Sequence, residues 1–479
     1  MLKSLVAILP LIAFIARAQQ APPSPDKAWP VSLDARFRAE APRTPSARPT
    51  LDPNRVYTLP DLVDAGERNN PQTRILWERA KQRAAAAGVA RSALFPTVAA
   101  MASASLNQYS LFFGKFYHED TAIFPAMLNL SYMVFDFGTR GAKIDQAKAN
   151  LLAADFDFND AHRQIIFRVT EAYYRLVDAI GQEGAAQATV TDAQTVQQAV
   201  EARLANGLAT LPDVLEARAA TAQAQYELAS IQGLEEIARG ALATAVGVSP
   251  TATFRVEDVS KTPLTETPHE TPYKTMDEPI QTIMERALAQ RPDLLAQVAR
   301  VRSTDAEIKQ TRSAYYPQVS FSGDWGHSNG FGQEKNFGSS AQSAIYPYQA
   351  QIKITWNIFD GGARRNELAG AQADQREAQA QVLSSRDQIE NEIWTSYSNL
   401  KTSQKQQEAA NALLQAADQS YASATEAFQA GVSTFIDVTT AQRSLARART
   451  AQATARVRLL MSLADLAFRA GDPIQPAQR

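Results

Sequence analysis

Residues 350–362 read Ala-Gln-Ile-Lys-Ile-Thr-Trp-Asn-Ile-Phe-Asp-Gly-Gly, and this stretch decides the fold. Apolar and polar side chains alternate along it until Asp360-Gly361-Gly362 interrupts the pattern. Such alternation predicts a β-strand with one apolar and one polar face that ends in a turn. The alternating apolar residues are Ile352, Ile354, Trp356 and Ile358.

The same sequence pattern occurs earlier in the chain, so the sequence contains a repeat. Residues 129–138 also alternate, and their Phe135-Asp136-x-Gly138 ending matches Phe359-Asp360-x-Gly362 at an offset of 224 residues. Upstream landmarks match at 221, which predicts three additional residues in the second copy, between Pro317 and Phe359, where a hairpin loop would lie. Two copies of one module predict a pseudo-symmetric fold. Pairs at 224 are Tyr173 and Tyr397, Leu176 and Leu400, Gly207 and Gly431, and Asp213 and Asp437; pairs at 221 are Pro71 and Pro292, and Pro96 and Pro317.

Composition excludes several classes of function. The chain has 479 residues, a net charge of -2 and no cysteine. A near-neutral chain without a basic patch gives no indication of nucleic-acid binding. The lack of thiols excludes disulfides, thiolate metal sites and a lipid on an N-terminal cysteine. The four histidines lack a metal-ligand spacing, and no phosphate loop or nucleophile elbow occurs. We therefore expect neither an enzyme nor a cofactor.

The N-terminal sequence predicts export. A short basic start and an apolar run lead to Ala16-Arg17-Ala18, an A-x-A site, so residues 1–18 are predicted to be a cleaved signal peptide. Residues 19–56 are rich in proline, which predicts an extended arm. After the signal no stretch approaches the ~20 apolar residues that a spanning helix needs. At the other end, residues 473–479 form a short tail.

Each copy is predicted to contain one β-hairpin, at about residues 97–135 and about residues 318–359. We expect the hairpin loops at 110–122, which is aromatic and polar, and at 326–346, which is rich in Gly, Ser and Asn. Each of the four strands supplies the ~9–11 residues that cross an outer membrane, but about eight strands are needed to close a barrel. If these strands meet lipid, several chains must contribute to one barrel.

A long helix without proline is predicted after each hairpin, at 139–206 and 362–430. Apolar residues at i, i+4, i+8 and i+11 form a stripe on each, which predicts a coiled-coil seam of mostly small side chains. At 1.5 Å per residue each helix is ~100 Å long. Return helices follow at 212–246 and 434–470. The stripes contain Ile165, Val169, Tyr173 and Leu176, and Ile389, Ile393, Tyr397 and Leu400.

These elements divide the chain into two repeats. The first is placed at residues 57–247 and the second at 279–472, with a Pro-rich linker at 248–278 that we expect to lie outside the helical rods. Asp136 and Asp360 are predicted to cap the long helices, because an aspartate before a helix accepts hydrogen bonds from its first amides.

Together the motifs resemble those of the TolC-like outer membrane efflux proteins over about residues 57–472. They include Asn69-Asn70-Pro71, Arg291-Pro292-Asp293-Leu294, the F-D-x-G strand exits and the turn at 431–438. The resemblance implies an α+β membrane protein and a homotrimer. In it, four strands per chain complete a twelve-stranded barrel in the outer membrane, and long coiled-coil helices form a periplasmic tunnel. It also implies a passive exit duct of a tripartite efflux or type I secretion system, which works with a periplasmic adaptor and an inner membrane pump.

The resemblance also implies site residues at the periplasmic tip. It places Asp437 on the tunnel axis, where three symmetry-related carboxylates would raise one another's pKa and favour cation binding or protonation. Thr440 stands at the family's next acidic position, and Phe428 and Ser433 occupy the places of its Tyr–Arg latch, so that hydrogen bond cannot form here. Asp213 lies at the equivalent turn of the first copy. The helix tips implied to contact the adaptor are at Gly207 and Gly431.

Two alternatives stay open at this stage. Asp213 and Asp437 could simply be first-turn residues favoured by the helix dipole. The whole chain could be a soluble periplasmic coiled-coil adaptor or structural rod, which accounts for the helical hairpins but leaves the four alternating strands unexplained. The cargo is not indicated, since small toxic molecules and polypeptides use the same kind of duct.

Overall fold

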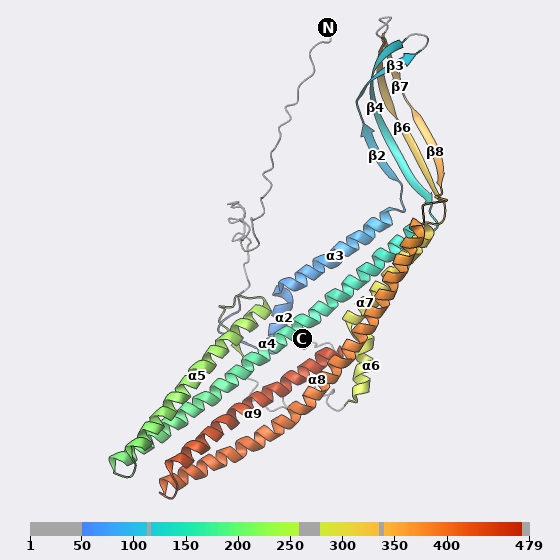
Figure 1. Cartoon of the computed structure of the whole chain (residues 1–479). Helices are drawn as coiled ribbons and strands as arrows, with labels where there is room; N and C mark the ends of the chain where they lie inside the picture. Colours follow the sequence, from blue (N-terminus) through green and yellow to red (C-terminus); the bar gives the residue numbers. More distant parts are fainter. Residues whose placement is uncertain (1–49, 113–115, 258–277, 335–339, 472–479) are drawn as a thin grey trace, which may run out of the picture. The chain divides into compact units, whose positions relative to one another are not determined.

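The computed structural model describes residues 50–112, 116–257, 278–334 and 340–471 (Figure 1). The predicted signal peptide, most of the Pro-rich arm, most of the linker and the whole C-terminal tail lie outside these residues. A short parallel pairing connects the start of the first repeat with the linker that follows it: β1, Val56–Tyr57, lies beside β5, Arg255–Val256.

The two hairpins lie side by side in one antiparallel sheet (Figure 1). β2 and β3 form the outer strand of the first hairpin and pair with β4, which pairs in turn with β6. β6 pairs on its other side with β7 and β8. Because each outer strand is interrupted once, the sheet is four strands wide. The bounds are β2 Thr97–Ala102, β3 Ser105–Phe112, β4 Phe116–Phe135, β6 Gln318–Glu334, β7 Ser340–Ile345 and β8 Tyr348–Thr355.

Equivalent residues pair in the same register in both hairpins. Val98 lies opposite Leu130 in the first hairpin, and Val319 lies opposite Ile354 in the second. Val98 and Val319 are related by the offset of 221, and Leu130 and Ile354 by the offset of 224. The three additional residues of the second copy therefore lie in its hairpin loop, and this prediction is confirmed.

The predicted extents of the two loops are wrong, because the strands of both hairpins continue into them. β6 contains glycines and serines that are typical of loops, yet it pairs with β4 along almost its whole length. Ladder pairing with a neighbouring strand outweighs the local composition. In the predicted loop 110–122, β3 extends to Phe112 and β4 begins at Phe116. In the predicted loop 326–346, β6 extends to Glu334 and β7 begins at Ser340.

Gly326 is a glycine that this sheet requires. A Cβ at this position would lie 2.3 Å from the carbonyl oxygen of Ala126 and 2.7 Å from the Cα of Met127, both on β4. Any side chain would therefore push β4 and β6 apart, and a glycine in a strand often marks such a close approach of two backbones.

One face of the sheet is apolar and the other polar, as the alternation predicts. On the apolar face, Trp325, Ile352 and Ile354 are 60%, 71% and 69% exposed. On the polar face, the side-chain amide of Asn129 donates a hydrogen bond to the carboxylate of Asp324 at 2.7 Å. A single chain thus leaves a large apolar surface uncovered.

Two helices of 67 residues, α4 and α8, follow the hairpins and correspond to the long helices predicted at 139–206 and 362–430 (Figure 1). A helix of 36 residues follows each of them, α5 after α4 and α9 after α8, and runs back along it. In the described part of the chain, none of the helices combines the length and the apolar character needed to cross a bilayer. The bounds are α2 Leu59–Asn69, α3 Pro71–Ser92, α4 Thr139–Ala205, α5 Leu211–Val246, α6 Ile280–Gln290, α7 Pro292–Ser313, α8 Ala363–Gln429 and α9 Phe435–Ala470.

The predicted apolar stripes form the helical core. Ile165, Val169 and Tyr173 of α4 are buried in one cluster with residues of α2 and α5. Ile389 and Ile393 of α8 are buried in a second cluster with residues of α6 and α9. Equivalent residues of the two copies therefore make equivalent seams.

A repeated ion pair joins the segment after the second strand of each hairpin to the long helix that follows. The carboxylate of Asp136 accepts hydrogen bonds from the backbone N–H of Arg140 at 2.8 Å and from its guanidinium at 3.0 Å. The same guanidinium donates to the carbonyl oxygens of Ala93, after α3, and of Val134, in β4, both at 3.3 Å. The predicted capping role is confirmed, but the arginine was not predicted. The second copy repeats these contacts with Asp360, Arg364, Ala314 and Ile358.

Gly326→Ala is expected to destabilise the sheet by about 3 kcal/mol or more, because the added methyl group overlaps backbone atoms of β4. Gly330→Ala is the matched control on the same strand, since its Cβ would meet only the Ser343 hydroxyl oxygen, at 3.0 Å, and that side chain can rotate. Urea unfolding followed by circular dichroism measures both. Equal stabilities of the two variants would show that the close approach is not a constraint.

Candidate functional site

The candidate site is the pair of helical tips, where the same turn occurs twice. Gly207 follows α4 with a φ of 72°, and Gly431 follows α8 with a φ of 79°. Both values are left-handed, and a glycine adopts them without strain. Each turn closes with the hydrogen bond typical of a helix C-terminus. The bonds run from Leu208 N–H to the Arg203 carbonyl at 2.8 Å and from Val432 N–H to the Ala427 carbonyl at 2.9 Å.

Asp213 and Asp437 lie in the first turns of α5 and α9, and each forms a capping box with the threonine before the helix. Thr434 donates to the Asp437 carboxylate through its backbone N–H at 2.9 Å and its hydroxyl at 2.7 Å. Thr210 donates to Asp213 in the same way, at 2.8 and 2.6 Å. These hydrogen bonds hold the pKa of both carboxyls below the usual value. Within one chain both carboxylates therefore act as helix caps.

The other residues singled out at the second tip divide between surface and core. Thr440 is exposed like Asp437, one helical turn further along α9. The hydroxyl of Ser433 donates to the carbonyl oxygen of Ala424 at 3.4 Å. Phe428 is buried in an apolar cluster that contains residues of both tips. The carboxylate and the threonine thus lie at the surface, and the phenylalanine lies between the two hairpins.

Arg203 joins the two tips through Phe428. Its guanidinium carbon lies 4.5 Å from the centroid of the Phe428 ring, and one of its terminal N–H groups donates to the Phe428 carbonyl oxygen at 2.6 Å. A cation over a buried aromatic face is stabilised by the ring quadrupole. The Phe428 carbonyl at the end of α8 also accepts the Gly431 N–H at 3.0 Å, so the arginine supplies a further donor to the turn.

A second polar contact joins the hairpins further from the tips. The guanidinium of Arg449 on α9 lies 2.5 Å from the carboxylate of Asp192 on α4. Both side chains are about one-quarter exposed, at 25% and 26%, so the pair is partly shielded from water. Burial raises the pKa of the nearby Tyr421 hydroxyl, and the negative charge of Asp192 raises it further.

Neither contact between the hairpins was predicted, for a reason that lies in the sequence. The partners are 225 and 257 residues apart, so no local spacing connects them. Arg203 also stands in the last turn of its helix, where a basic residue is expected to serve its own helix dipole. The contact of Arg203 with Phe428 becomes apparent only when the two hairpins are packed together.

Both tips expose large apolar side chains. Leu208 and Leu211 are exposed at the first tip, and Val432 and Ile436 are exposed at the second. Four large apolar side chains beside two turns form a surface that another protein could cover.

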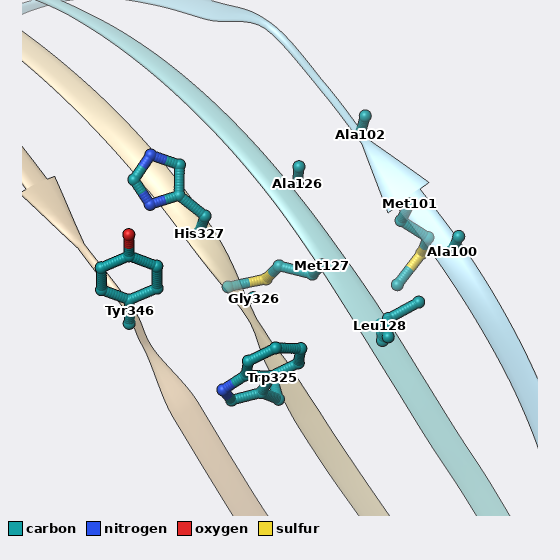
Figure 2. A pocket seen from close by; sticks show the side chains of 10 residues that line it. All are labelled: Ala100, Met101, Ala102, Ala126, Met127, Leu128, Trp325, Gly326, His327 and Tyr346. Carbon is teal, nitrogen blue, oxygen red and sulfur yellow. The ribbon is translucent and has the colours of Figure 1, made fainter.

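The sheet contains a hollow of about 400 Å³, shown in Figure 2. Alanine, methionine and leucine side chains of β2 and β4 line much of it, together with Trp325 and His327 of β6 and Tyr346. The His327 ring nitrogen is 3.1 Å from the side-chain oxygen of Asn329. No acid–base pair lines the hollow, and in the residues that the structure describes no group of three or more His, Asp or Glu is placed to hold a metal.

Comparison with known proteins identifies a family and several proteins that this chain resembles. A family model described as outer membrane efflux protein matches residues 62–248 and 283–472, one segment for each repeat. The chain is similar to protein CyaE of Bordetella pertussis, with 27% identity over 357 residues that cover 73% of this chain and 70% of CyaE. It is similar to outer membrane protein OprJ of Pseudomonas aeruginosa, with 25% identity over 308 residues that cover 64% of this chain and 61% of OprJ. The outer-membrane channel OprN has the same fold, with a TM-score of 0.72 and 21% identity over 90% of this chain and 97% of that one.

Thr434→Val is expected to weaken the cap of α9 at neutral pH, which hydrogen–deuterium exchange of residues 435–440 measures as lower protection. The carboxyl pKa is lowered in the folded tip, so the cap is complete above the usual carboxyl pKa and is lost as the pH falls through the lower folded value. The difference from the parent should therefore become smaller well below pH ~4, where the hydrogen bond from the Asp437 N–H to the Thr434 hydroxyl is the part of the cap that remains. Thr210→Val is the matched control and should affect residues 211–216 instead. Unchanged protection of α9 at pH 7 would contradict the capping role.

Proposed function

Because this chain belongs to the outer membrane efflux protein family, we propose that three copies of it close one barrel and continue it as a tunnel. The chain is an outer membrane channel of the kind that serves efflux and secretion, and it extends into the periplasm. Four strands from each chain would form a twelve-stranded barrel. A periplasmic adaptor and an inner membrane pump would complete the system and supply the energy, so the channel itself is a passive duct.

The unpaired sheet edges are the observation that carries this proposal. Within the described residues, β2 and β3 pair only with β4, and β7 and β8 pair only with β6. In a bilayer no water is present to satisfy the remaining backbone groups, so a spanning sheet must close on itself. Four strands are too few to close, whereas twelve form a barrel with strand tilts that are common in outer membrane proteins.

The helices support the same assembly. α7 packs between α4 and α8 and buries Leu294, Ala299 and Ala306. α3 is its equivalent in the first copy, yet among the described elements α3 packs extensively only against α4. Its Trp77 and Val89 are 47% and 71% exposed. By the repeat, the missing neighbour of α3 is the long helix α8 of another copy.

At the periplasmic end we assign the narrow point to the second tip. Asp437 would form a ring of three carboxylates, with Thr440 one turn behind it, while Phe428 and Ser433 support the turn from within. Asp213 would cap the first tip and contribute its charge beside that ring. The exposed apolar side chains next to Gly207 and Gly431 support an adaptor contact at both turns. The soluble-rod alternative leaves the apolar sheet face without cover.

The repeat also predicts which residues meet between chains. Met127 of β4 lies opposite Gly326 of β6. The offsets of 224 and 221 convert this pair into Gln351 of one chain and Ser105 of the next. Opposite residues in an antiparallel pair have Cβ atoms about 4.5–5.5 Å apart, which approaches the range that a disulfide bridges.

Ser105→Cys combined with Gln351→Cys is therefore expected to yield a disulfide-linked trimer on oxidation, because the chain has no other thiol. Non-reducing gel electrophoresis after heating measures the product. Ser105→Cys with Thr355→Cys is the matched control: these residues are four positions out of register and should link poorly. Only monomers from the first pair would rule out this barrel.

Asp437→Ala is expected to reduce the cation selectivity of the channel and its block by divalent cations, because the variant removes three carboxylates from the narrow point. Single-channel recording in planar bilayers measures both. Thr434→Val is the matched control, since it weakens the same capping box and keeps the three carboxylates. If the two variants behave alike, loss of a helix cap explains the effect and the ring assignment is wrong.

A further inference from the structure

The two helical hairpins of one chain, α4–α5 and α8–α9, meet along a seam within the chain, where α4 packs against α9. The rings of Phe167 on α4 and Phe468 on α9 stack there with centroids 4.4 Å apart. Further along the same two helices, a Cβ added at Gly181 would lie 3.4 Å from the Cβ of Ala453. Because the helices are antiparallel, these two contacts fix the register of the seam.

The repeat transfers this register to the seam between chains, where α8 of one chain would lie beside α5 of the next. In the seam within a chain, the register places Thr170 of α4 level with Ala464 of α9, and Thr170 is only 2% exposed. The offset of 224 converts this pair into Trp394 and Gly240. The seam between chains therefore sets a large aromatic side chain opposite a residue without a side chain.

The stacked rings show the reverse change. The equivalents of Phe167 and Phe468 are Asn391 and Thr244, so the seam between chains lacks both rings. This smaller pair lies one helical turn before Trp394 on α8. A side chain on a helix leans towards the N-terminus of its own helix, and the indole of Trp394 is thus directed towards the level at which the two rings are replaced. The space that the rings fill within a chain is available to the indole between chains.

Within one chain, both surfaces of this seam are open. Trp394 is 56% exposed, and Ile237, one turn before Gly240 on α5, is 70% exposed. Among the described residues, a Cβ added at Gly240 would meet only Pro250, at 3.7 Å from its carbonyl oxygen and 3.9 Å from its Cβ. Large exposed apolar side chains that face each other by the repeat form a surface that another protein covers.

We propose that Trp394 of each chain inserts beside Gly240 of the neighbouring chain, against Ile237, and is the principal anchor of the helical seam between chains. This inference rests on the proposed trimer, and the partner is a second copy of this chain. The two surfaces differ, so α8 of one copy fits α5 of the next and the contact closes around a ring. A tryptophan seated in a small-residue notch is the kind of side chain that dominates the free energy of an interface.

A double-mutant cycle on the purified trimer tests this anchor. We expect Trp394→Ala to accelerate dissociation of the trimer about tenfold, because the variant removes the anchoring side chain. Gly240→Leu should also accelerate dissociation, because the added side chain occupies the site of the indole. In the double variant the leucine meets an alanine, so dissociation should be no faster than in either single variant. Gel electrophoresis after timed incubation at an elevated temperature measures these rates.

Gly233→Leu is the matched control on the same helix. Among the described residues, a Cβ added there meets no heavy atom within 4 Å, and the register places Gly233 level with Lys401 of the neighbouring chain. Its effect on dissociation should be the same with and without Trp394→Ala. A clash of the new leucine at position 240 with Pro250 of its own chain would be equally insensitive to Trp394→Ala. Additive effects of Trp394→Ala and Gly240→Leu would therefore overturn the anchor.

A disulfide separates this inference from the trimer itself. Ala229 and Lys405 are the equivalents of Ala453 and Gly181, so Ala229→Cys/Lys405→Cys should link neighbouring chains on oxidation. Linked trimers together with an additive cycle would leave the assembly standing and show that Trp394 is not its anchor. Only monomers from this pair, and from Ser105→Cys/Gln351→Cys, would mean that no neighbour covers the seam, and the assembly and the anchor would both be wrong.

Discussion

The constraint on which the structure depends is a sheet that is only four strands wide. It has an apolar face and two edges without partners in the described chain. Every backbone amide and carbonyl that faces hydrocarbon needs a hydrogen bond, since leaving one unpaired costs several kcal/mol. A single chain cannot meet that requirement by folding alone. The repeat resolves it, because the strand pairing between the two copies can occur again between chains.

The sheet and the helices are coupled by the paired Asp–Arg junctions. Arg140 contacts the end of β4, the start of α4 and the carbonyl of Ala93 after α3, so three elements meet at one guanidinium. Arg364 does the same in the second copy. Both guanidinium groups are largely shielded from water, with side chains 15% and 14% exposed. Each hairpin is thereby fixed to its helices in the same way, which allows a barrel to continue as a helical tunnel.

Periodicity and repeated landmarks predicted most of this architecture, because they are local or depend on a fixed offset. The stripes around Tyr173 and Ile389 and the extra residues in the second loop were found in this way. The extent of the strands was not, because Gly326 is typical of a loop by composition and its role appears only when β4 lies against it. The candidate site was less predictable still. Asp437 carries a motif, whereas Arg203 gains its partner only when two hairpins pack together.

The two copies of a duplicated module need not make identical interfaces. The interface within a chain can differ from an equivalent interface between chains, because only the first joins hairpins that are covalently connected. Both hairpins of one chain are present at equal amounts and close together during folding, so contacts between them form without an association step. Substitutions such as Arg203 opposite Phe428 can therefore stabilise the seam within a chain independently of the seam between chains, where the equivalent residues are Ala427 and Leu204.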